Sequence, residues 1–214
     1  MSPAGRLLVF TDRRLCEGAG HQLSEVVAAA AEAGARTFVF REKDLPRDER
    51  RALAVTCLDA ATECGASLII ASDATLAAEL GELAVHVASG EPVPSAPSWG
   101  RSCHDRHEVA NAARDGASYV TVSPVFASAS KPGYGPALGR EGLAELSMVA
   151  QPLPVLALGG VGPDNAASCL ESGAAGVAVM SWVMAAADPA TATAELVAAL
   201  DRHLAGETSA VQHA

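Results

Sequence analysis

The sequence has few basic residues, no closely paired cysteines and no long apolar run. Lysine and arginine number 15 against 25 acidic residues, which gives a formal net charge of −10. A chain of this charge repels polyanions and has no basic cluster to offset the repulsion, so we expect no nucleic-acid partner. The 5 cysteines never form a C-x-x-C pair, which argues against a disulfide framework or a zinc knuckle.

Hydrophobic residues make up 50% of the chain. They nevertheless form no uninterrupted run of about 18 residues, as a membrane-spanning helix needs. The N-terminus also lacks the charged region and apolar core of a secretion signal. We therefore expect a soluble cytoplasmic protein without a membrane partner. Composition does not change abruptly along the 214 residues, which predicts one domain around a single large core.

Short apolar runs alternate with longer stretches of helical periodicity. The runs, which are the expected strands, are residues 6–12, 37–40, 67–71, 83–87, 99–103, 119–122, 154–158 and 176–180. The expected helices are residues 23–33, 46–64, 75–80, 106–115, 141–149, 163–172 and 188–204. The fifth strand rests partly on the rhythm of the others, because Pro92, Pro94 and Pro97 interrupt any regular element before it.

This alternation predicts an α/β protein that is a single-domain (β/α)8 TIM barrel over residues 1–206, with residues 207–214 as a frayed tail. An open, doubly wound sheet is the competing architecture. It is disfavoured because no G-x-G-x-x-G follows the first strand, where a dinucleotide-binding fold needs it.

Polar residues and glycines follow the expected strands. In a TIM barrel the active site forms where the strands end, so these residues are expected to face one site. They are Arg41, Lys43, Asp73, Glu91, Ser102, His104, Ser128, Ser130, Lys131, Gly159, Gly160 and Ser181. Read alone, residues 41–44 would be a solvated charge run, but the coincidence of all these groups at strand ends favours a site.

The stretch over residues 119–139 changes from a strand into a polar, glycine-rich loop. Pro124 ends the strand, because proline cannot continue the ladder of hydrogen bonds. Ser128 and Ser130 then offer hydroxyl donors and Lys131 offers a positive charge, which suits a bound phosphate or diphosphate. A long flexible connection of small residues is the alternative reading of this loop.

Six motifs in this order resemble the thiamine phosphate synthase family. They are FREKD at 40–44, SD at 72–73, GRSCH at 100–104, SPVFASASK at 123–131, ALGGVGPDN at 157–165 and AVMS at 178–181. The resemblance extends from the first strand to the last helix. It implies a (β/α)8 barrel that joins hydroxymethylpyrimidine diphosphate to hydroxyethylthiazole phosphate, two small phosphorylated substrates, and releases diphosphate with Mg²⁺ as the metal.

The resemblance also implies a role for each matching residue. The catalytic group that holds the diphosphate would be Arg41, Lys43, Ser102 and Lys131. The other substrate contacts would be Ser72, Ser128, Ser130, Gly159, Gly160, Met180 and Ser181, of which the last four bind the thiazole phosphate. Asp73 and Glu91 would hold Mg²⁺, which takes one or two carboxylates together with substrate oxygens and water.

Several positions depart from the family pattern, among them Ser72 in place of asparagine and Ser128 and Ser130 in place of threonine. Val39 stands where the family usually has glutamine, Ala74 where it has arginine, and Glu91 where it has aspartate. A related group, the thiazole tautomerases, shares the fold and uses a histidine after the sixth strand, where this chain has Pro124. A tautomerase and a barrel that binds a thiamine precursor or phosphate without turnover therefore stay open as alternatives. The sequence leaves the oligomeric state open, including a homo-oligomer.

Overall fold

The computed structural model describes residues 6–127 and 136–211, and its centre is a closed barrel of parallel strands. The strands follow one another around the barrel in chain order, and β1 closes it against β8 through Leu8 and Ala178. They are β1 (Leu7–Phe10), β2 (Thr37–Phe40), β3 (Ser67–Ala71), β4 (Val85–Val87), β5 (Trp99–Cys103), β6 (Tyr119–Val122), β7 (Val155–Leu158) and β8 (Gly176–Val179). This confirms the predicted TIM barrel.

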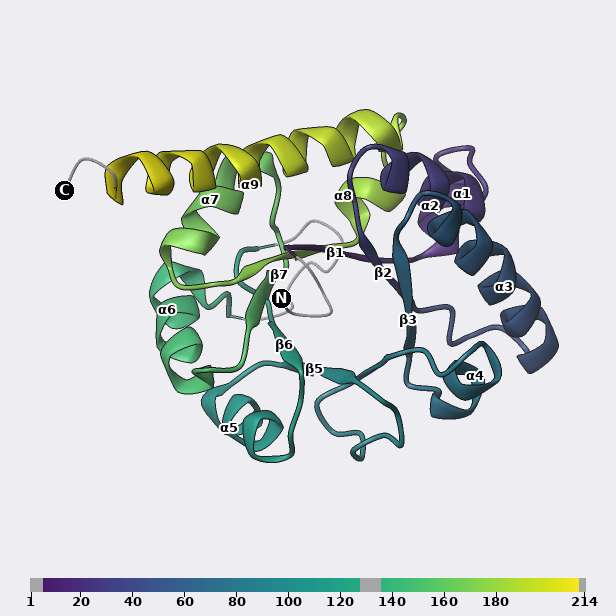
Figure 1. Cartoon of the computed structure of the whole chain (residues 1–214), viewed down its shortest axis with the longest axis horizontal. Helices are drawn as coiled ribbons and strands as arrows, with labels where there is room; N and C mark the ends of the chain where they lie inside the picture. The colour runs from purple at the N-terminus through teal and green to yellow at the C-terminus, as the bar shows by residue number, and fades with distance from the viewer. Residues whose placement is uncertain (1–5, 128–135, 212–214) are drawn as a thin grey trace.

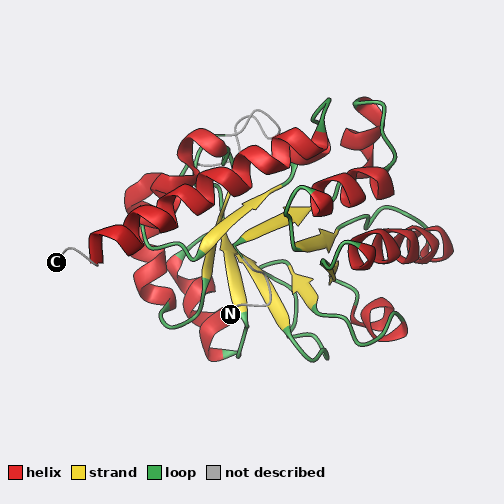
Figure 2. Ribbon diagram, turned by 45° about the horizontal axis from the view of Figure 1, so that its top comes forward, coloured by secondary structure: helices red, strands yellow, loops and turns green. Residues whose placement is uncertain are grey.

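Helices enclose the strands on the outside, as Figures 1 and 2 show. They are α1 (Arg13–Gly18), α2 (Leu23–Glu32), α3 (Arg47–Glu63), α4 (Ala74–Glu79), α5 (Arg106–Arg114), α6 (Gly139–Ala150), α7 (Pro163–Glu171), α8 (Ser181–Met184) and α9 (Pro189–Val211). Within the part of the chain that the structure describes, none of them combines the length and hydrophobicity needed to cross a bilayer.

The strands bury both of their faces, which explains why they read as continuous apolar runs. Alternate side chains of a strand point to opposite sides of a sheet. In β1, Leu8 and Phe10 belong to the small cluster inside the barrel, whereas Leu7 and Val9 belong to the larger cluster under the helices. Val39 is fully buried in the inner cluster, so its side chain packs inside the barrel.

Two short helices were absent from the sequence prediction. Helix α1 begins after Asp12, whose carboxylate accepts hydrogen bonds from the backbone N–H groups of Arg14 and Leu15. Helix α8 is 4 residues long and begins directly after β8. Helix α1 has the sequence RRLCEG, whose only two large apolar residues are adjacent and show no helical periodicity, and α8 spans only about one turn.

The prediction was also wrong about the end of the last helix. We expected it to stop near Leu204, but α9 continues to Val211, so residues 207–211 are helical where we predicted a frayed tail. No proline interrupts residues 204–211, and the one glycine among them, Gly206, costs a helix only about 1 kcal/mol relative to alanine.

The connection from β4 to β5 differs from the others because residues 88–98 form no helix (Figure 1). Arg101 on β5 supports this connection, and its side chain is only 7% exposed. One guanidinium nitrogen donates to the carbonyl of Glu91 at 2.9 Å, and another lies 3.5 Å from Asp115. Arg101 thereby ties the segment that carries Glu91 to the outside of the barrel.

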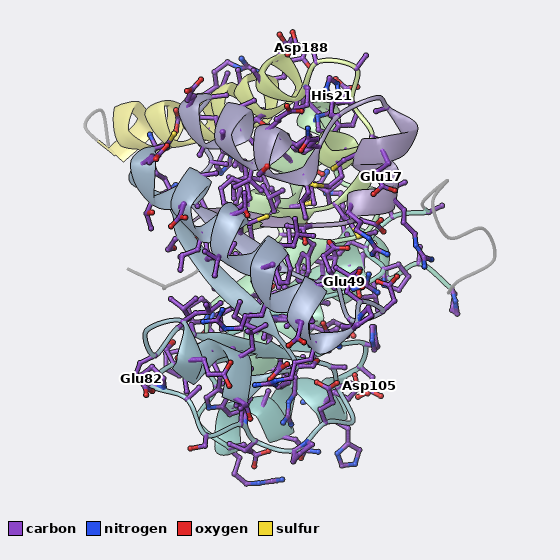
Figure 3. All side chains as sticks on the ribbon, turned by 90° about the vertical axis from the view of Figure 1, so that its right-hand side faces the viewer. Glu17, His21, Glu49, Glu82, Asp105 and Asp188 are labelled. Atoms are coloured by element: carbon purple, nitrogen blue, oxygen red, sulfur yellow. The ribbon has the colours of Figure 1, made fainter. Side chains whose placement is uncertain are left out.

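Contacts between the two ends of the chain help to close the structure. Figure 3 shows His21, which follows α1, at the same edge of the molecule as Asp188, which precedes α9. The His21 Nε2 atom lies 3.1 Å from the carbonyl oxygen of Ala187. Asp188 accepts from the Thr191 backbone N–H, as a helix-capping residue does, and this contact fixes where α9 begins.

Candidate active site

A cavity of about 600 Å³ opens at the carboxyl ends of the strands, where the sequence predicted the site. Eight of the residues that the sequence analysis named line it: Arg41, Lys43, Ser102, His104, Gly159, Gly160, Met180 and Ser181. Their chemical roles remain predictions. Ser128, Ser130 and Lys131 lie outside the described residues, so the structure does not place them.

The Arg41–Glu42–Lys43 segment is fixed from beneath by Glu42, which is only 2% exposed. The Thr11 hydroxyl donates to Glu42 Oε1 at 2.7 Å and accepts the backbone N–H of Arg41 at 2.9 Å. Glu42 also pairs with the Arg13 guanidinium at 3.2 Å. Glu42 therefore anchors the loop while Arg41 and Lys43 face the cavity, so the two cations are held on a rigid backbone.

Lys43 connects the cavity to a small polar cluster at the ends of β3 and β4. Its ammonium group donates to the hydroxyl of Ser72 and lies 3.4 Å from Glu91 Oε1. The Ser72 hydroxyl donates to the other Glu91 oxygen, which also accepts the Ala88 backbone N–H at 2.9 Å. Burial opposes ionisation of Glu91, but the Ser72 and Ala88 hydrogen bonds and the Lys43 charge lower its pKa overall. Glu91 is therefore an anion that positions Lys43.

Asp73 is turned away from the main cavity. One of its oxygens accepts the Leu76 backbone N–H at 2.9 Å and so caps α4. The other lies 3.0 Å from the Arg50 guanidinium, beside a separate cavity of about 170 Å³. Ser72, Asp73 and Glu91 therefore sit beside the main cavity rather than on its wall.

The carboxylates of this cluster fit a Mg²⁺ ion only in part. Asp73 and Glu91 supply two carboxylates at neighbouring strand ends. Glu91 Oε2 already accepts two hydrogen bonds, whereas each of the other three oxygens keeps a lone pair beyond the one used in the bonds above. Residues 6–127 and 136–211 contain no group of three or more His, Cys, Asp or Glu side chains placed to hold a metal. An ion here would thus depend on substrate oxygens, as Mg²⁺ commonly does.

Two histidines belong to the cavity wall. His86 is 3% exposed, and its ring nitrogens contact the hydroxyls of Tyr119 at 3.0 Å and Ser102 at 2.9 Å. Burial, reinforced by the charge of Lys43, lowers the pKa of His86 to about 3, so the ring is neutral at physiological pH. His104 Nδ1 lies 2.7 Å from the carbonyl oxygen of Ser123, next to Pro124.

The turn after β7 presents backbone to the cavity. Gly159 and Gly160 have φ angles of +95° and +64°, and a Cβ on Gly160 would lie 2.5 Å from the carbonyl oxygen of Ala127. Asn165 closes the turn, because its amide donates to the Gly160 carbonyl and accepts the Gly162 N–H, both at 2.9 Å. Such a turn exposes N–H groups that suit a bound anion.

The sequence assigned no role to several residues of the wall. They include Phe10, His86, Asn165 and Trp182. Asn165 had a usable signal, because an amide side chain three residues after Gly162 at the start of a helix indicates a cap. Trp182 lies on α8, a helix that the sequence did not predict, so its place on the wall could not be foreseen.

These features define a class of protein: a TIM-barrel enzyme whose cavity at the strand ends combines cationic side chains with a glycine turn. The chain belongs to the thiamine monophosphate synthase family, whose model matches residues 7–183. The resemblance drawn from the six motifs is thereby confirmed.

Individual relatives agree over most of the chain. A thiamine-phosphate synthase from Roseiflexus castenholzii is 38% identical over 91% of this chain and 88% of its own length. A thiamine-phosphate synthase from Salinibacter ruber is 36% identical over 92% of this chain and 89% of its own. A solved thiamine phosphate pyrophosphorylase from Pyrococcus furiosus superposes with a TM-score of 0.82 at 28% identity and covers 95% of this chain and 98% of its own.

Proposed function

We propose that the protein is a thiamine phosphate synthase, which joins hydroxymethylpyrimidine diphosphate to hydroxyethylthiazole phosphate and releases diphosphate. The observation that carries the proposal is the cavity itself, which has two different surfaces suited to anions. Arg41, Lys43 and Ser102 form one, and the turn at Gly159 and Gly160 forms the other. Two phosphorylated substrates require two such surfaces, and curated synthases share the sequence over most of its length.

The reaction exchanges one bond at the pyrimidine methylene carbon for another. The bond from this carbon to the diphosphate oxygen breaks, and the electron pair leaves with the diphosphate. The thiazole nitrogen supplies the pair for the new carbon–nitrogen bond. Negative charge grows on the leaving group, and the cations Arg41 and Lys43, fixed by Glu42 and Glu91, are placed to stabilise it without reorganising.

The turn at Gly159 and Gly160 is proposed to hold the thiazole phosphate together with the backbone at Met180 and Ser181. Lys131, Ser128 and Ser130 are proposed to complete the diphosphate contacts. We also propose the cytoplasm as the compartment, since charged phosphate esters do not cross membranes unaided.

Mg²⁺ is proposed as the metal, held by Glu91 and Asp73 with the diphosphate oxygens of the substrate. When bound, such an ion neutralises charge on the leaving group. Asp73→Asn is the informative variant, because asparagine still caps α4 but carries no charge. We expect this variant to need a higher Mg²⁺ concentration for half-maximal activity, while α4 stays intact by circular dichroism.

The alternatives receive less support. A tautomerase must move a proton, and Pro124, at the position where that group carries its histidine, has no group that transfers one. The named relatives are synthases, which favours turnover over simple binding.

Lys43→Ala tests the proposal within the cavity. Removal of one preorganised contact to the leaving group should lower kcat for thiamine phosphate formation by about 10²-fold or more. Arg114→Ala is the matched control, because Arg114 is exposed on α5 and does not line the cavity. Equal activity of the two variants would contradict the assigned role of Lys43.

A further inference from the structure

A buried polar network crosses three strands beneath the cavity. The register places His86 of β4 opposite Gly100 of β5, and Gly100 opposite Tyr119 of β6. Because Gly100 has no side chain, the His86 ring and the Tyr119 phenol meet across β5. A Cβ on Gly100 would lie 2.2 Å from the Tyr119 ring, so this position admits only glycine while Tyr119 keeps its place.

The hydrogen atoms of this network can be assigned from the need to satisfy buried donors. Tyr119 is fully buried, and burial raises the pKa of its phenol, so the phenol keeps its proton. Among the described residues, His86 Nδ1, at 3.0 Å, is the hydrogen-bond partner of that hydroxyl. A buried hydroxyl proton without an acceptor costs about 1–3 kcal/mol. Tyr119 therefore donates to Nδ1, and the neutral ring carries its proton on Nε2.

The proton on Nε2 points to Ser102, 2.9 Å away. Thr121 is fully buried and lies opposite Ser102 in the strand register. Its hydroxyl donates a hydrogen bond to the same Ser102 oxygen at 3.4 Å. A serine oxygen accepts two hydrogen bonds and donates one. With both acceptor positions filled from below, the Ser102 hydroxyl proton is left to point away from the network, into the cavity that Ser102 lines.

We propose that His86, held by Tyr119, is a positioning residue that turns Ser102 into a dedicated hydrogen-bond donor for a diphosphate oxygen of the substrate. The proposal rests on the proposed function for the identity of the anion. The opposite arrangement, with the Nε2 lone pair accepting from Ser102, would aim the hydroxyl proton inward and present only lone pairs to an anion.

Neutrality of the ring is a requirement of this arrangement. A protonated His86 would carry a proton on Nδ1 and would force Tyr119 to accept, which leaves the phenol proton without a partner. Lys43, whose charge acts on His86, and Glu91, which pairs with Lys43, are the charged groups that influence the ring. Phe10, whose ring meets that of His86 edge-on at 5.1 Å between centroids, packs against it from β1.

The tautomer can be measured on the intact wild-type protein without any substrate. Nitrogen-15 NMR of the histidine rings distinguishes a protonated Nε2 from a protonated Nδ1, and His86→Gln identifies the signal. We expect His86 to carry its proton on Nε2 and to stay neutral throughout pH 5–8. A proton on Nδ1 would overturn the proposal, whatever reaction the protein catalyses.

A double-mutant cycle tests the coupling to Ser102 with inorganic diphosphate as the probe, measured by calorimetry. His86→Asn, whose amide mimics Nδ1 and does not reach Ser102, should weaken diphosphate binding by about 10-fold, the worth of one hydrogen bond to a charged group. His86→Gln, whose amide mimics Nε2, should restore most of the affinity. In a Ser102→Ala background, His86→Asn should have no further effect.

Equal losses from His86→Asn in both backgrounds would show a merely structural role and overturn the proposal. Tyr119→Phe keeps the ring volume and supplies the same test if the histidine variants do not fold. Tyr119→Phe should weaken diphosphate binding in the wild-type background and should have no effect in the Ser102→Ala background. If wild-type protein lacks synthase activity while these couplings hold, the proposed function fails and the positioning role stands.

Discussion

At the scale of single residues, the cations of the site depend on acidic side chains that do not touch the cavity. Glu42 holds the loop of Arg41 and Lys43 from below, and Glu91 holds the Lys43 ammonium from the side. Neither acidic side chain lines the cavity. The sequence shows an alternation of charges at 41–44 but not which of them turn inward, because that choice is made by Thr11 and Arg13, about thirty residues away.

Glu42→Gln tests this support. An amide keeps the shape but loses the ion pair with Arg13, so we expect a loss of about 1–3 kcal/mol in the free energy of unfolding. We also expect a higher KM for the pyrimidine diphosphate, because the cationic loop is no longer fixed. Denaturant unfolding and steady-state kinetics measure the two effects. The control is Glu17→Gln, at an exposed position on α1 that Figure 3 labels. Equal changes in unfolding free energy and KM for the two variants would contradict the role of Glu42.

His86 gives the stability a predictable pH dependence. The pKa of His86 is about 3 in the folded protein, against an ordinary value of 6.5. At a pH between these two pKa values, the unfolded chain binds one more proton than the folded protein. Stability therefore falls as the pH decreases through this range. From pH 7 to pH 5, the wild type should lose about 2 kcal/mol more than His86→Gln. Identical losses in chemical denaturation would show that His86 is not buried as a neutral ring.

At the scale of elements, the turn between β7 and α7 carries the proposed thiazole phosphate contacts on its backbone. Gly160→Ala should weaken binding of the thiazole phosphate by about 10-fold or more, because the added Cβ collides with Ala127 and displaces the turn. Gly65→Ala is a matched control, with a similar φ of +68° and open space around its Cβ.

Gly65 precedes β3, at the opposite end of the barrel from the cavity. Its variant should lose about 1 kcal/mol of stability and no affinity. Calorimetry measures the affinity of both variants for the thiazole phosphate. Unchanged affinity in Gly160→Ala would place the phosphate elsewhere.

The strands could be predicted because both of their faces are buried, so each appears as an apolar run. Helices α2, α3 and α6, each of ten residues or more, showed periodicity and stop signals and were found within a few residues of their bounds. Helices α1 and α8 lacked this signal. The support of residues 88–98 by Arg101 was also invisible, because it links Glu91, Asp115 and Trp99 through contacts that form only in the folded chain.

At the scale of the whole molecule, the closed barrel is what brings distant motifs to one cavity. Several of the residues named from the sequence line this cavity, because the site of a TIM barrel lies at the strand ends, while their chemical roles stay predictions. The sequence could not place Asp73, whose carboxylate serves as a helix cap and as the partner of Arg50. It also could not show that Gly100 lets His86 and Tyr119 meet, since that contact depends on the strand register.

The most direct test of the central claim is the release of diphosphate by the purified protein, followed with each substrate alone and with both together. The account predicts release only when the pyrimidine diphosphate and the thiazole phosphate are both present, with thiamine phosphate formed in equal amount. It predicts that a chelator stops the reaction and that Mg²⁺ restores it. Release from the pyrimidine diphosphate alone at the full rate, or no release from the complete mixture, would contradict the account.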